Sequence, residues 1–393
     1  MKIGILGTRG IPNNHGGFEQ FAEYLSFGLV QKGHSVTVYN SHNHPYKESS
    51  WKGVDIIHCY DPESKYGNIG PFIYDLNCIL DSRKRDFDII LQLGYGTSSI
   101  WGWLLPRKKS IVTTNMDGLE WKRSKYSKPV QRFLLYAEKL GVKYSDYLIS
   151  DSIAIKRYLS SKYPKDSLFI PYGADIFDKP NFSVLNKFNL NSNKFNLLIA
   201  RLEPENNIEI ILDGAVLSNT EIPFLVIGNH KTKYGYYLKR KYHLYDNIQF
   251  HGGIYDINIL NNLRYFSNLY FHGHSVGGTN PSLLEAMASN SLICAHDNVF
   301  NKSILGSDTF YFKTKEEVAT LIQSTAKTDH LHELASKAKK ISETYNWPSI
   351  IEQYDCHFKD ILAKKGNSKE VIPVLDKDEI VLVSGGQYPY KSV

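Results

Sequence analysis

Two glycine pairs in this sequence each precede a segment whose apolar spacing predicts a helix. Gly16 and Gly17 stand before residues 18–33, and Gly277 and Gly278 stand before a second such segment. Glycine lets the backbone approach a ligand closely, and the unpaired N–H groups and dipole of a helix N-terminus attract negative charge. Each pair therefore has the chemistry of a phosphate-binding loop, although a glycine pair alone also occurs in plain strand-to-helix turns.

The residues around the second pair favour a nucleotide sugar as the ligand. Asn280 is a favourable N-cap, Pro281 suits the first helical position, and Glu285 lies one turn into the helix, where it can accept hydrogen bonds from ribose. Arg201 follows an apolar run at 196–200 that predicts a strand, and the carboxyl ends of parallel strands face the ligand crevice. Two helix N-termini and an arginine at one crevice suit a sugar diphosphate better than any single motif does.

The N-terminal glycines also allow a nicotinamide interpretation. Three glycines after the first predicted strand are spaced three apart: Gly4, Gly7 and Gly10. Tyr158 and Lys162 even supply the catalytic pair of short-chain dehydrogenases. However, residues 12–15 separate these glycines from the predicted helix, whereas a dinucleotide site begins its helix within the glycine motif. The second predicted strand ends in Asn40 rather than in an acidic residue that could bind ribose. A dehydrogenase would also leave residues 195–362 without a function. The sequence therefore favours the sugar interpretation, with Tyr158 and Lys162 as an ordinary exposed helix pair.

Short apolar runs alternate with amphipathic segments along most of the chain, which predicts parallel β-α-β units. Polar and turn residues interrupt the alternation between 177 and 193, and 393 residues suit two cores rather than one. We therefore predict an α/β protein with two Rossmann-like domains and a ligand cleft at their junction. The expected boundaries are a first domain at 1–180, a linker at 181–193, a second domain at 194–345, a helix at 346–365 and a tail at 366–393 that contains a loose segment or a short added strand.

The composition excludes several classes of protein. A formal net charge of +6 is too small for this length to imply nucleic acid, and the sequence lacks an uninterrupted apolar run of about 18 residues that could span a bilayer. The start, MKIGILG, lacks the layout of a signal peptide, which predicts a cytoplasmic protein. Four widely spaced cysteines favour buried free thiols over a zinc site or disulfides: Cys59, Cys78, Cys294 and Cys356.

A stretch at 121–133 alternates basic and bulky side chains. The members that define it are Trp121, Lys122, Arg123, Lys125 and Arg132. Such a surface can rest on an anionic membrane or receive an anionic, lipid-linked acceptor, and a solvated helix face is the plainer alternative. We therefore expect this stretch on the acceptor side or the membrane side, with peripheral contact at the inner face of the plasma membrane.

Four strings carry a resemblance to a known family: GTRGIPNNHGGFE, NMDGLEWKR, ARLEPENN and GGTNPSLLEAM. Over residues 1–362 the layout resembles the retaining glycosyltransferases of family 4, and the strings resemble the branch with bacterial rhamnosyltransferases of capsule and polysaccharide assembly. The resemblance implies the GT-B fold, in which two Rossmann-like domains face a central cleft. It also implies an acceptor-side first domain, a second domain that binds the nucleotide sugar, and a C-terminal helix that packs back on the first domain.

The resemblance further implies a donor site formed by both domains. Gly16 and Gly17 match the first-domain donor loop, and Arg201 matches the diphosphate-binding arginine. Glu285 matches the ribose-binding glutamate, and the backbone of 280–284 matches the stretch that meets the diphosphate. The donor-binding residues expected in the second domain are Arg201, His274, Gly277, Gly278, Thr279, Asn280, Pro281, Ser282, Leu283 and Glu285.

Three positions depart from the family pattern. The lysine expected five positions after the arginine is Asn206, so one positive charge against the leaving group is missing. The first glutamate of the Glu-x7-Glu pattern is Gly277, so contacts to the donor sugar are expected from His274 or the backbone of 277–279. The first-domain histidine near the reacting sugar corresponds to Asp117.

The implied reaction is a transfer with retention, in which an acceptor hydroxyl attacks on the face that the diphosphate leaves. Asp117, Arg201 and Glu285 are the expected catalytic residues, and neither a metal nor another cofactor is expected. The expected donor is dTDP-rhamnose, with UDP-hexoses next, and the expected acceptor is a saccharide, in particular a lipid-linked one. Two alternatives share the two-domain plan: a nucleotide-sugar 2-epimerase and a non-catalytic nucleotide-sugar-binding protein.

Overall fold

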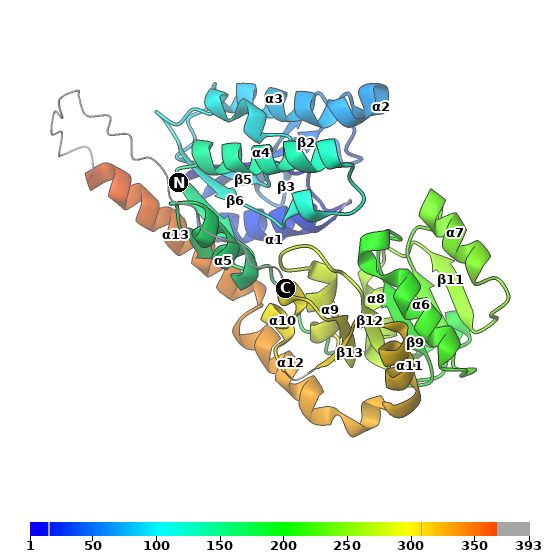
Figure 1. The fold of residues 1–393 in the computed structure, drawn as a ribbon. Helices are drawn as coiled ribbons and strands as arrows, with labels where there is room; N and C mark the ends of the chain where they lie inside the picture. Colours follow the sequence, from blue (N-terminus) through cyan, green and yellow to red (C-terminus); the bar gives the residue numbers. More distant parts are fainter. Residues whose placement is uncertain (15, 308, 368–393) are drawn as a thin grey trace, which may run out of the picture.

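Two sheets organise the chain, of which the computed structural model describes residues 1–14, 16–307 and 309–367 (Figure 1). The first sheet has the order β3-β4-β2-β1-β5-β6-β7-β8 and is parallel except for the pairing of β3 with β4. Its inner strands β5 and β6 are buried along their whole length, as expected when helices cover both faces. The strands are β1 (Lys2–Leu6), β2 (Ser35–Ser41), β3 (Ser50–Trp51), β4 (Val54–Cys59), β5 (Ile89–Leu93), β6 (Ile111–Asn115), β7 (Tyr147–Ser150) and β8 (Ser167–Phe169).

Helices with one apolar stripe flank this sheet. The first of them buries Phe21, Ala22, Leu25 and Leu29 on one face, and Gly33 follows its end with a φ of 83°. The helix begins at Gly17, directly at the first glycine pair. The helices of this domain are α1 (Gly17–Gln31), α2 (Glu63–Tyr66), α3 (Gly70–Ser82), α4 (Lys128–Tyr144) and α5 (Ile153–Lys162).

The second sheet is parallel throughout and has the order β11-β10-β9-β12-β13-β14. Its strands are β9 (Asn196–Ile199), β10 (Phe224–Ile227), β11 (Ile248–Gly252), β12 (Tyr270–His272), β13 (Ile293–His296) and β14 (Phe310–Phe312). The helices that follow are α6 (Ile208–Leu217), α7 (Lys233–Lys241), α8 (Ile257–Phe266), α9 (Pro281–Ala288), α10 (Val299–Leu305), α11 (Lys315–Ser324), α12 (Leu331–Glu343) and α13 (Trp347–Asn367). The expected pair of Rossmann-like α/β domains is confirmed.

Each sheet has a point at which the order of winding reverses. In the first sheet it lies between β1 and β5, and in the second between β9 and β12. In open parallel sheets, ligands bind beyond the carboxyl ends of the strands at this point. The loops that follow these four strands are therefore the places where each domain is expected to bind a ligand.

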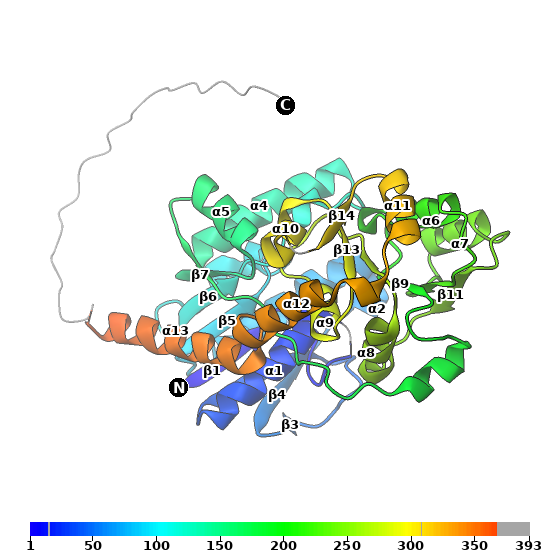
Figure 2. The same cartoon turned by 90° about the horizontal axis from the view of Figure 1, so that it is seen from below.

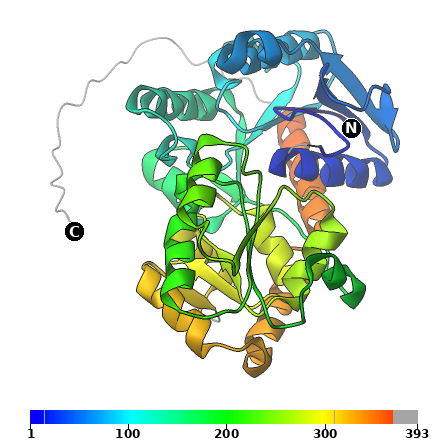
Figure 3. The ribbon, with the colours of Figure 1, turned by 90° about the vertical axis from the view of Figure 1, so that its right-hand side faces the viewer.

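The last helix returns from the second domain to the first (Figures 1 and 3). It lies beside α1, and Figure 2 shows the two helices together. His34 Nε2 lies 2.8 Å from an Asp355 carboxylate oxygen, and the Trp347 ring stacks on Tyr24 with centroids 4.4 Å apart. The prediction that the C-terminal helix packs back on the first domain is confirmed.

Three features differ from expectation or fall outside what is described. Cys356 is exposed, unlike the other three cysteines, because it lies on the solvent side of α13, where its thiol donates to Glu352. The expected linker contains a 3₁₀ segment at Phe182–Phe188. The expected tail strand falls at 368–393, outside the described residues. Within the described part, no helix is both long and apolar enough to cross a membrane.

Candidate active site

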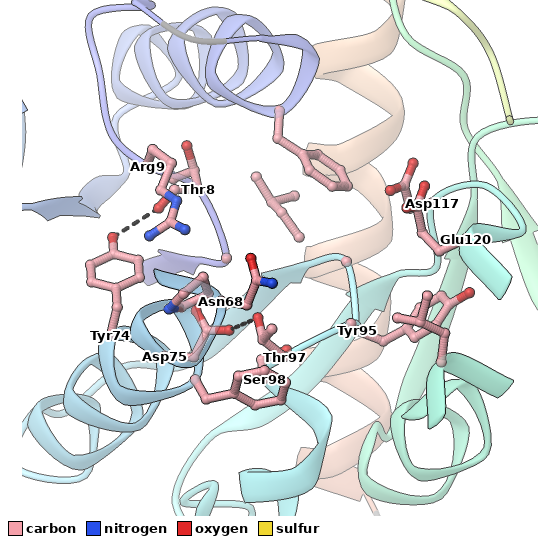
Figure 4. Close-up of a pocket in the computed structure, with 18 of the residues that line it drawn as sticks. Thr8, Arg9, Asn68, Tyr74, Asp75, Tyr95, Thr97, Ser98, Asp117 and Glu120 are labelled. Atoms are coloured by element: carbon pink, nitrogen blue, oxygen red, sulfur yellow. Dashed lines mark hydrogen bonds between the residues drawn. The ribbon is translucent and has the colours of Figure 1, made fainter. Parts of the chain in front are cut away.

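A pocket of 740 Å³ opens at the winding reversal of the first sheet (Figure 4). The loops after β1 and β5 supply residues 7–9 and 93–98, and the start of α3 and the start of α4 close its sides. The size lies within the usual range of small-molecule sites. Its apolar walls come from Phe18, Phe72, Leu93, Tyr95, Val130, Phe133 and Leu134.

Asp117 and Glu120 lie at one end of this pocket (Figure 4). Asp117 follows β6 with a φ of 51°, a conformation that non-glycine residues rarely adopt. The Asn115 side chain accepts a hydrogen bond of 3.1 Å from the Asp117 amide and donates to the Tyr354 hydroxyl of α13 at 3.3 Å. Burial and the Glu120 carboxylate raise the pKa of Asp117 to about 6, against the opposing charge of Arg123.

The opposite end of the pocket is polar and includes Asp75 and Thr97 (Figure 4). The Thr97 hydroxyl donates a hydrogen bond to the carboxylate of Asp75, a residue that is only 7% exposed. Burial raises the pKa of Asp75 to about 6, although that hydrogen bond and the charge of Arg9 lower it. Arg9 is itself paired with Asp61 at 2.7 Å and with Glu63 at 2.8 Å.

The crevice of the second domain holds Arg201 and His274, which follow β9 and β12 at its winding reversal. Asn206 donates a hydrogen bond of 2.8 Å to the backbone oxygen of Arg201, so it shapes this loop without adding charge. Burial and the charge of Arg201 lower the pKa of His274 to about 3, so its imidazole is neutral near pH 7. Arg201 remains exposed.

The two predicted glycine loops meet across the domain junction. A Cβ built on Gly17 would lie 3.3 Å from Cγ of Pro281, so the N-termini of α1 and α9 face each other closely. Gln20 of α1 donates a hydrogen bond of 3.2 Å to Glu285 of α9. Arg264, fully buried on α8, pairs with the other Glu285 oxygen at 2.7 Å. The structure therefore brings Gly16, Gly17 and Glu285 to one place.

A second contact joins the Asp117 turn to the loop before α9. A Cβ on Gly118 would lie 2.7 Å from Cα of Gly277, and a Cβ on Gly278 would lie 2.1 Å from the Asp151 carboxylate. The Thr279 amide donates to Asp151 at 2.8 Å, and burial raises the pKa of Asp151 to about 8. Glycine is required here because the two domains touch through their backbones.

The N-terminus of α9 differs in detail from a bare phosphate cradle. Asn280 is the N-cap, as predicted, and its side chain accepts a hydrogen bond of 3.0 Å from the Ser282 amide. The Leu283 amide donates to the Asn280 carbonyl at 3.0 Å, and Pro281 has no N–H to give. The amides of residues 281–283 are thus absent or occupied, which leaves the Gly277 and Gly278 backbone as the part of this loop best placed to meet an anion.

The basic and aromatic stretch at 121–133 contributes to the junction rather than only to an outer surface. Arg123 lies 2.6 Å from Glu120 and 3.4 Å from Glu205 of the second domain. The Lys125 amide also donates to Glu205, at 3.2 Å, and burial together with the charges of Arg201 and Arg123 lowers the pKa of Lys125. These contacts place the two cations beside Arg201.

The remaining members of that stretch lie elsewhere. Trp121 donates a hydrogen bond of 3.1 Å to the buried Glu138, whereas Lys122 and Arg132 are exposed. Glu138 also accepts from Tyr158 at 2.9 Å and from Lys162 at 2.7 Å. Lys162 is exposed, as expected from the sequence, whereas Tyr158 is half-buried, and both donate to a buried carboxylate of the first domain.

Several residues of the site escaped sequence reasoning. Asp75 and Thr97 belong to no motif, and only the fold joins the start of α3 to the loop after β5. Glu205 and Arg264 act through contacts with residues that were recognised, Arg123 and Glu285. Their position at strand or helix ends is the only sequence signal that pointed toward them.

Comparisons with known proteins divide the chain at the same place as the fold. Residues 184–343 match the family model described as glycosyl transferases group 1, and residues 1–175 match a domain of unknown function, DUF1972. No curated protein matches the chain. Because the family matched by residues 1–175 has no assigned function, the family evidence for activity comes from the second domain.

Solved structures share the whole architecture. Sucrose-phosphate synthase from Thermosynechococcus elongatus superposes with a TM-score of 0.74 and 16% identity, over 92% of this chain and 99% of that one. A trehalose 6-phosphate synthase from Burkholderia multivorans superposes with a TM-score of 0.68 and 11% identity, over 95% of this chain and 99% of that one. HepE from Anabaena, in complex with UDP and glucose, superposes with a TM-score of 0.68 and 14% identity, over 91% of this chain and 99% of that one. At these identities the likeness shows the fold, which is GT-B, and the group 1 domain within that fold makes the chain a glycosyltransferase.

Proposed function

We propose that this chain transfers a sugar from a nucleotide sugar held by the second domain to a saccharide in the pocket of the first. The observation that carries the proposal is the contact between Gly118 and Gly277. Asp117 lies at the end of the pocket, and this contact places it next to the second-domain loop that contains Gly277. HepE, which has the same fold, was solved with UDP-glucose, which supports a nucleotide sugar as donor. A pocket in the first domain supports a second substrate, and so favours transfer over epimerisation.

On the donor side, cations from both domains offset the charge of the departing diphosphate. Arg201 extends from the loop after β9, and Lys125 and Arg123 approach it from the first domain. Arg123 is already paired with two carboxylates, so Lys125 is the second cation that takes the place of the lysine absent at Asn206. Glu285, held by Arg264 and Gln20, receives the ribose hydroxyls. No metal is needed in this scheme, because side-chain cations balance the leaving group.

The transfer proceeds with retention. The acceptor hydroxyl attacks the anomeric carbon on the face from which the diphosphate leaves, the bond from that carbon to the diphosphate oxygen breaks, and the hydroxyl proton passes to the diphosphate. Asp117, ionised at neutral pH, stabilises the positive charge that develops at the anomeric carbon. The close approach of Gly118 to Gly277 keeps the two substrates oriented.

The donor that we propose first is dTDP-rhamnose, because four strings in the sequence resemble those of rhamnosyltransferases, and UDP-hexoses are second. The acceptor is lipid-linked, as in surface polysaccharide assembly, and the exposed Lys122 and Arg132 suit an anionic surface beside the pocket.

The proposal is tested with labelled nucleotide sugars and a bacterial lipid extract. The wild type should transfer label to the extract, and Arg201→Ala should lower transfer at least about 100-fold, because a preorganised charge at the leaving group is removed. The variant Arg240→Ala, which removes an exposed arginine from the last turn of α7 in the same domain, is the matched control. Near-full transfer by Arg201→Ala would overturn the assignment of the diphosphate site.

A further inference from the structure

The polar end of the first-domain pocket lies away from Asp117 and has no role in the reaction described above (Figure 4). Its lining residues are Thr8, Arg9, Asn68, Asp75, Thr97 and Ser98. Among the described residues, Thr97 alone hydrogen-bonds to the Asp75 carboxylate, through Oδ2. A buried carboxylate with an oxygen turned to a cavity is costly unless a donor group meets it, and a ligand hydroxyl is such a donor.

We propose that this polar end is a recognition subsite for a neutral saccharide unit of the acceptor, with Asp75 and Thr97 binding its hydroxyl groups. Asp75 accepts from a hydroxyl, and Thr97, which donates to Asp75, keeps lone pairs that can accept from another. The aromatic walls of the same pocket, Phe18, Phe72 and Phe133, suit the apolar face of a sugar ring. The inference rests on the proposed function, since it assigns the acceptor that the transfer requires.

The charges around the subsite explain why the unit must be neutral. Glu19 and Asp75 line the pocket, and Glu19 is held by the Arg9 amide at 2.8 Å. Among the described residues that line the pocket, Arg9 is the only cation, and Asp61 and Glu63 already neutralise its guanidinium. A uronic acid or sugar phosphate would bring a further negative charge beside carboxylates that no free cation offsets.

The subsite is tested with synthetic acceptors of matched tails. Octyl β-D-glucoside and octyl β-D-maltoside are the neutral probes, and octyl β-D-glucuronide is the acidic one. Release of nucleoside diphosphate from dTDP-rhamnose and from UDP-glucose is measured against probe concentration, after subtraction of the release without probe. We expect a neutral probe to stimulate release at a KM at least about tenfold below that of the glucuronide.

Two variants test the named residues. Asp75→Asn should raise the KM for the neutral probe about tenfold, and Thr97→Val should raise it in the same direction, because each removes binding to a hydroxyl. Asp55→Asn, an exposed carboxylate of β4, is the matched control and should leave the KM unchanged. Thermal unfolding of each variant checks the fold, and calorimetry with dTDP and UDP checks the donor site.

The outcomes separate the two claims. Stimulation by the glucuronide at an equal or lower KM, an unchanged KM in both folded variants, or no stimulation by either neutral probe would overturn the subsite. A wild type that binds neither dTDP nor UDP and releases no nucleoside diphosphate would instead contradict the proposed function.

Discussion

At the scale of single residues, Asp117 is where strain, charge and position coincide. It holds a left-handed backbone conformation that non-glycine residues rarely adopt, and the Asn115 side chain accepts a hydrogen bond from its amide. Its carboxylate lines the pocket of the first domain, while the next residue touches the Gly277 loop of the second. An acid fixed between the two proposed substrate sites is well suited to act on the bond that is made between the substrates.

Replacing Asp117 by Asn should lower turnover about 100-fold or more and leave the Kd for nucleoside diphosphate within about twofold. The amide keeps the shape of the side chain but loses the charge that acts in the transition state. Turnover in steady-state transfer and calorimetric titration with dTDP and UDP measure the two quantities. Normal turnover would remove Asp117 from the mechanism.

Transfer should also depend on pH through Asp117. The pKa of Asp117 is raised to about 6, above the ordinary value of an aspartate. The side chain is therefore ionised above that pH and loses its negative charge by protonation as the pH falls through it. The turnover of the wild type should therefore fall on the acidic side of about pH 6. A pH profile of Asp117→Asn should lack this limb, and an unchanged limb in the variant would assign it to another group.

Lys125→Gln should weaken binding of nucleoside diphosphate roughly tenfold, because a charge-assisted contact to the diphosphate is lost. A double variant, Lys125→Gln with Asn206→Lys, supplies a cation from the second domain, beside Arg201. It should recover part of the affinity for nucleoside diphosphate. Calorimetry on Lys122→Gln, an exposed neighbour, supplies the control. Unaltered affinity in Lys125→Gln would leave Arg201 as the sole cation.

At the scale of elements, the central feature is the approach of two helix N-termini, α1 and α9. The glycine pairs that precede them were evident in the sequence, and so was the Asn280 cap, because caps and glycine loops are local signals. The facing of Gly17 and Pro281 was not evident, since it depends on how the two sheets are set against each other. Asp75 and Thr97 were missed for the same reason: they come together only when α3 and β5 pack.

A side chain at Gly17 should interfere with this approach. Gly17→Val would press on Pro281, whose Cγ lies 3.3 Å from the first added carbon, and should abolish transfer by separating α1 from α9. Gln31→Val, at an exposed position of the opposite end of α1, is the matched control. Transfer assays are read beside thermal unfolding, and full activity in Gly17→Val would show that the loops need not close on each other.

At the scale of the whole molecule, α13 runs from the second domain to the first, and its Tyr354 hydrogen-bonds to Asn115, next to the Asp117 turn. The sequence predicted this helix from its apolar spacing and the resemblance predicted its return, whereas its hydrogen bond to the Asp117 turn depends on tertiary packing. Tyr354 on α13 is buried and holds Asn115, which in turn holds Asp117. The helix therefore helps to fix the strained residue between the domains.

Tyr354→Phe should lower turnover several-fold with little change in the acceptor KM, because the chain from Tyr354 through Asn115 to Asp117 loosens. The cost in the free energy of unfolding should be about 1 kcal/mol, the usual worth of one hydrogen bond. Tyr345→Phe, in the turn before α13, is the matched control. Equal turnover in the two variants would assign α13 a purely architectural role.

The central claim is that the two domains together pass a sugar from a nucleotide to a second molecule. The most direct measurement incubates the protein with dTDP-rhamnose and UDP-hexoses, with and without a bacterial lipid extract, and follows both the nucleotide sugar and the extract by mass spectrometry. We predict that a component of the extract gains the mass of one sugar residue, and that free nucleoside diphosphate accumulates with it. A new isomer of the nucleotide sugar formed without extract, or binding with no change in either substrate, would contradict the account.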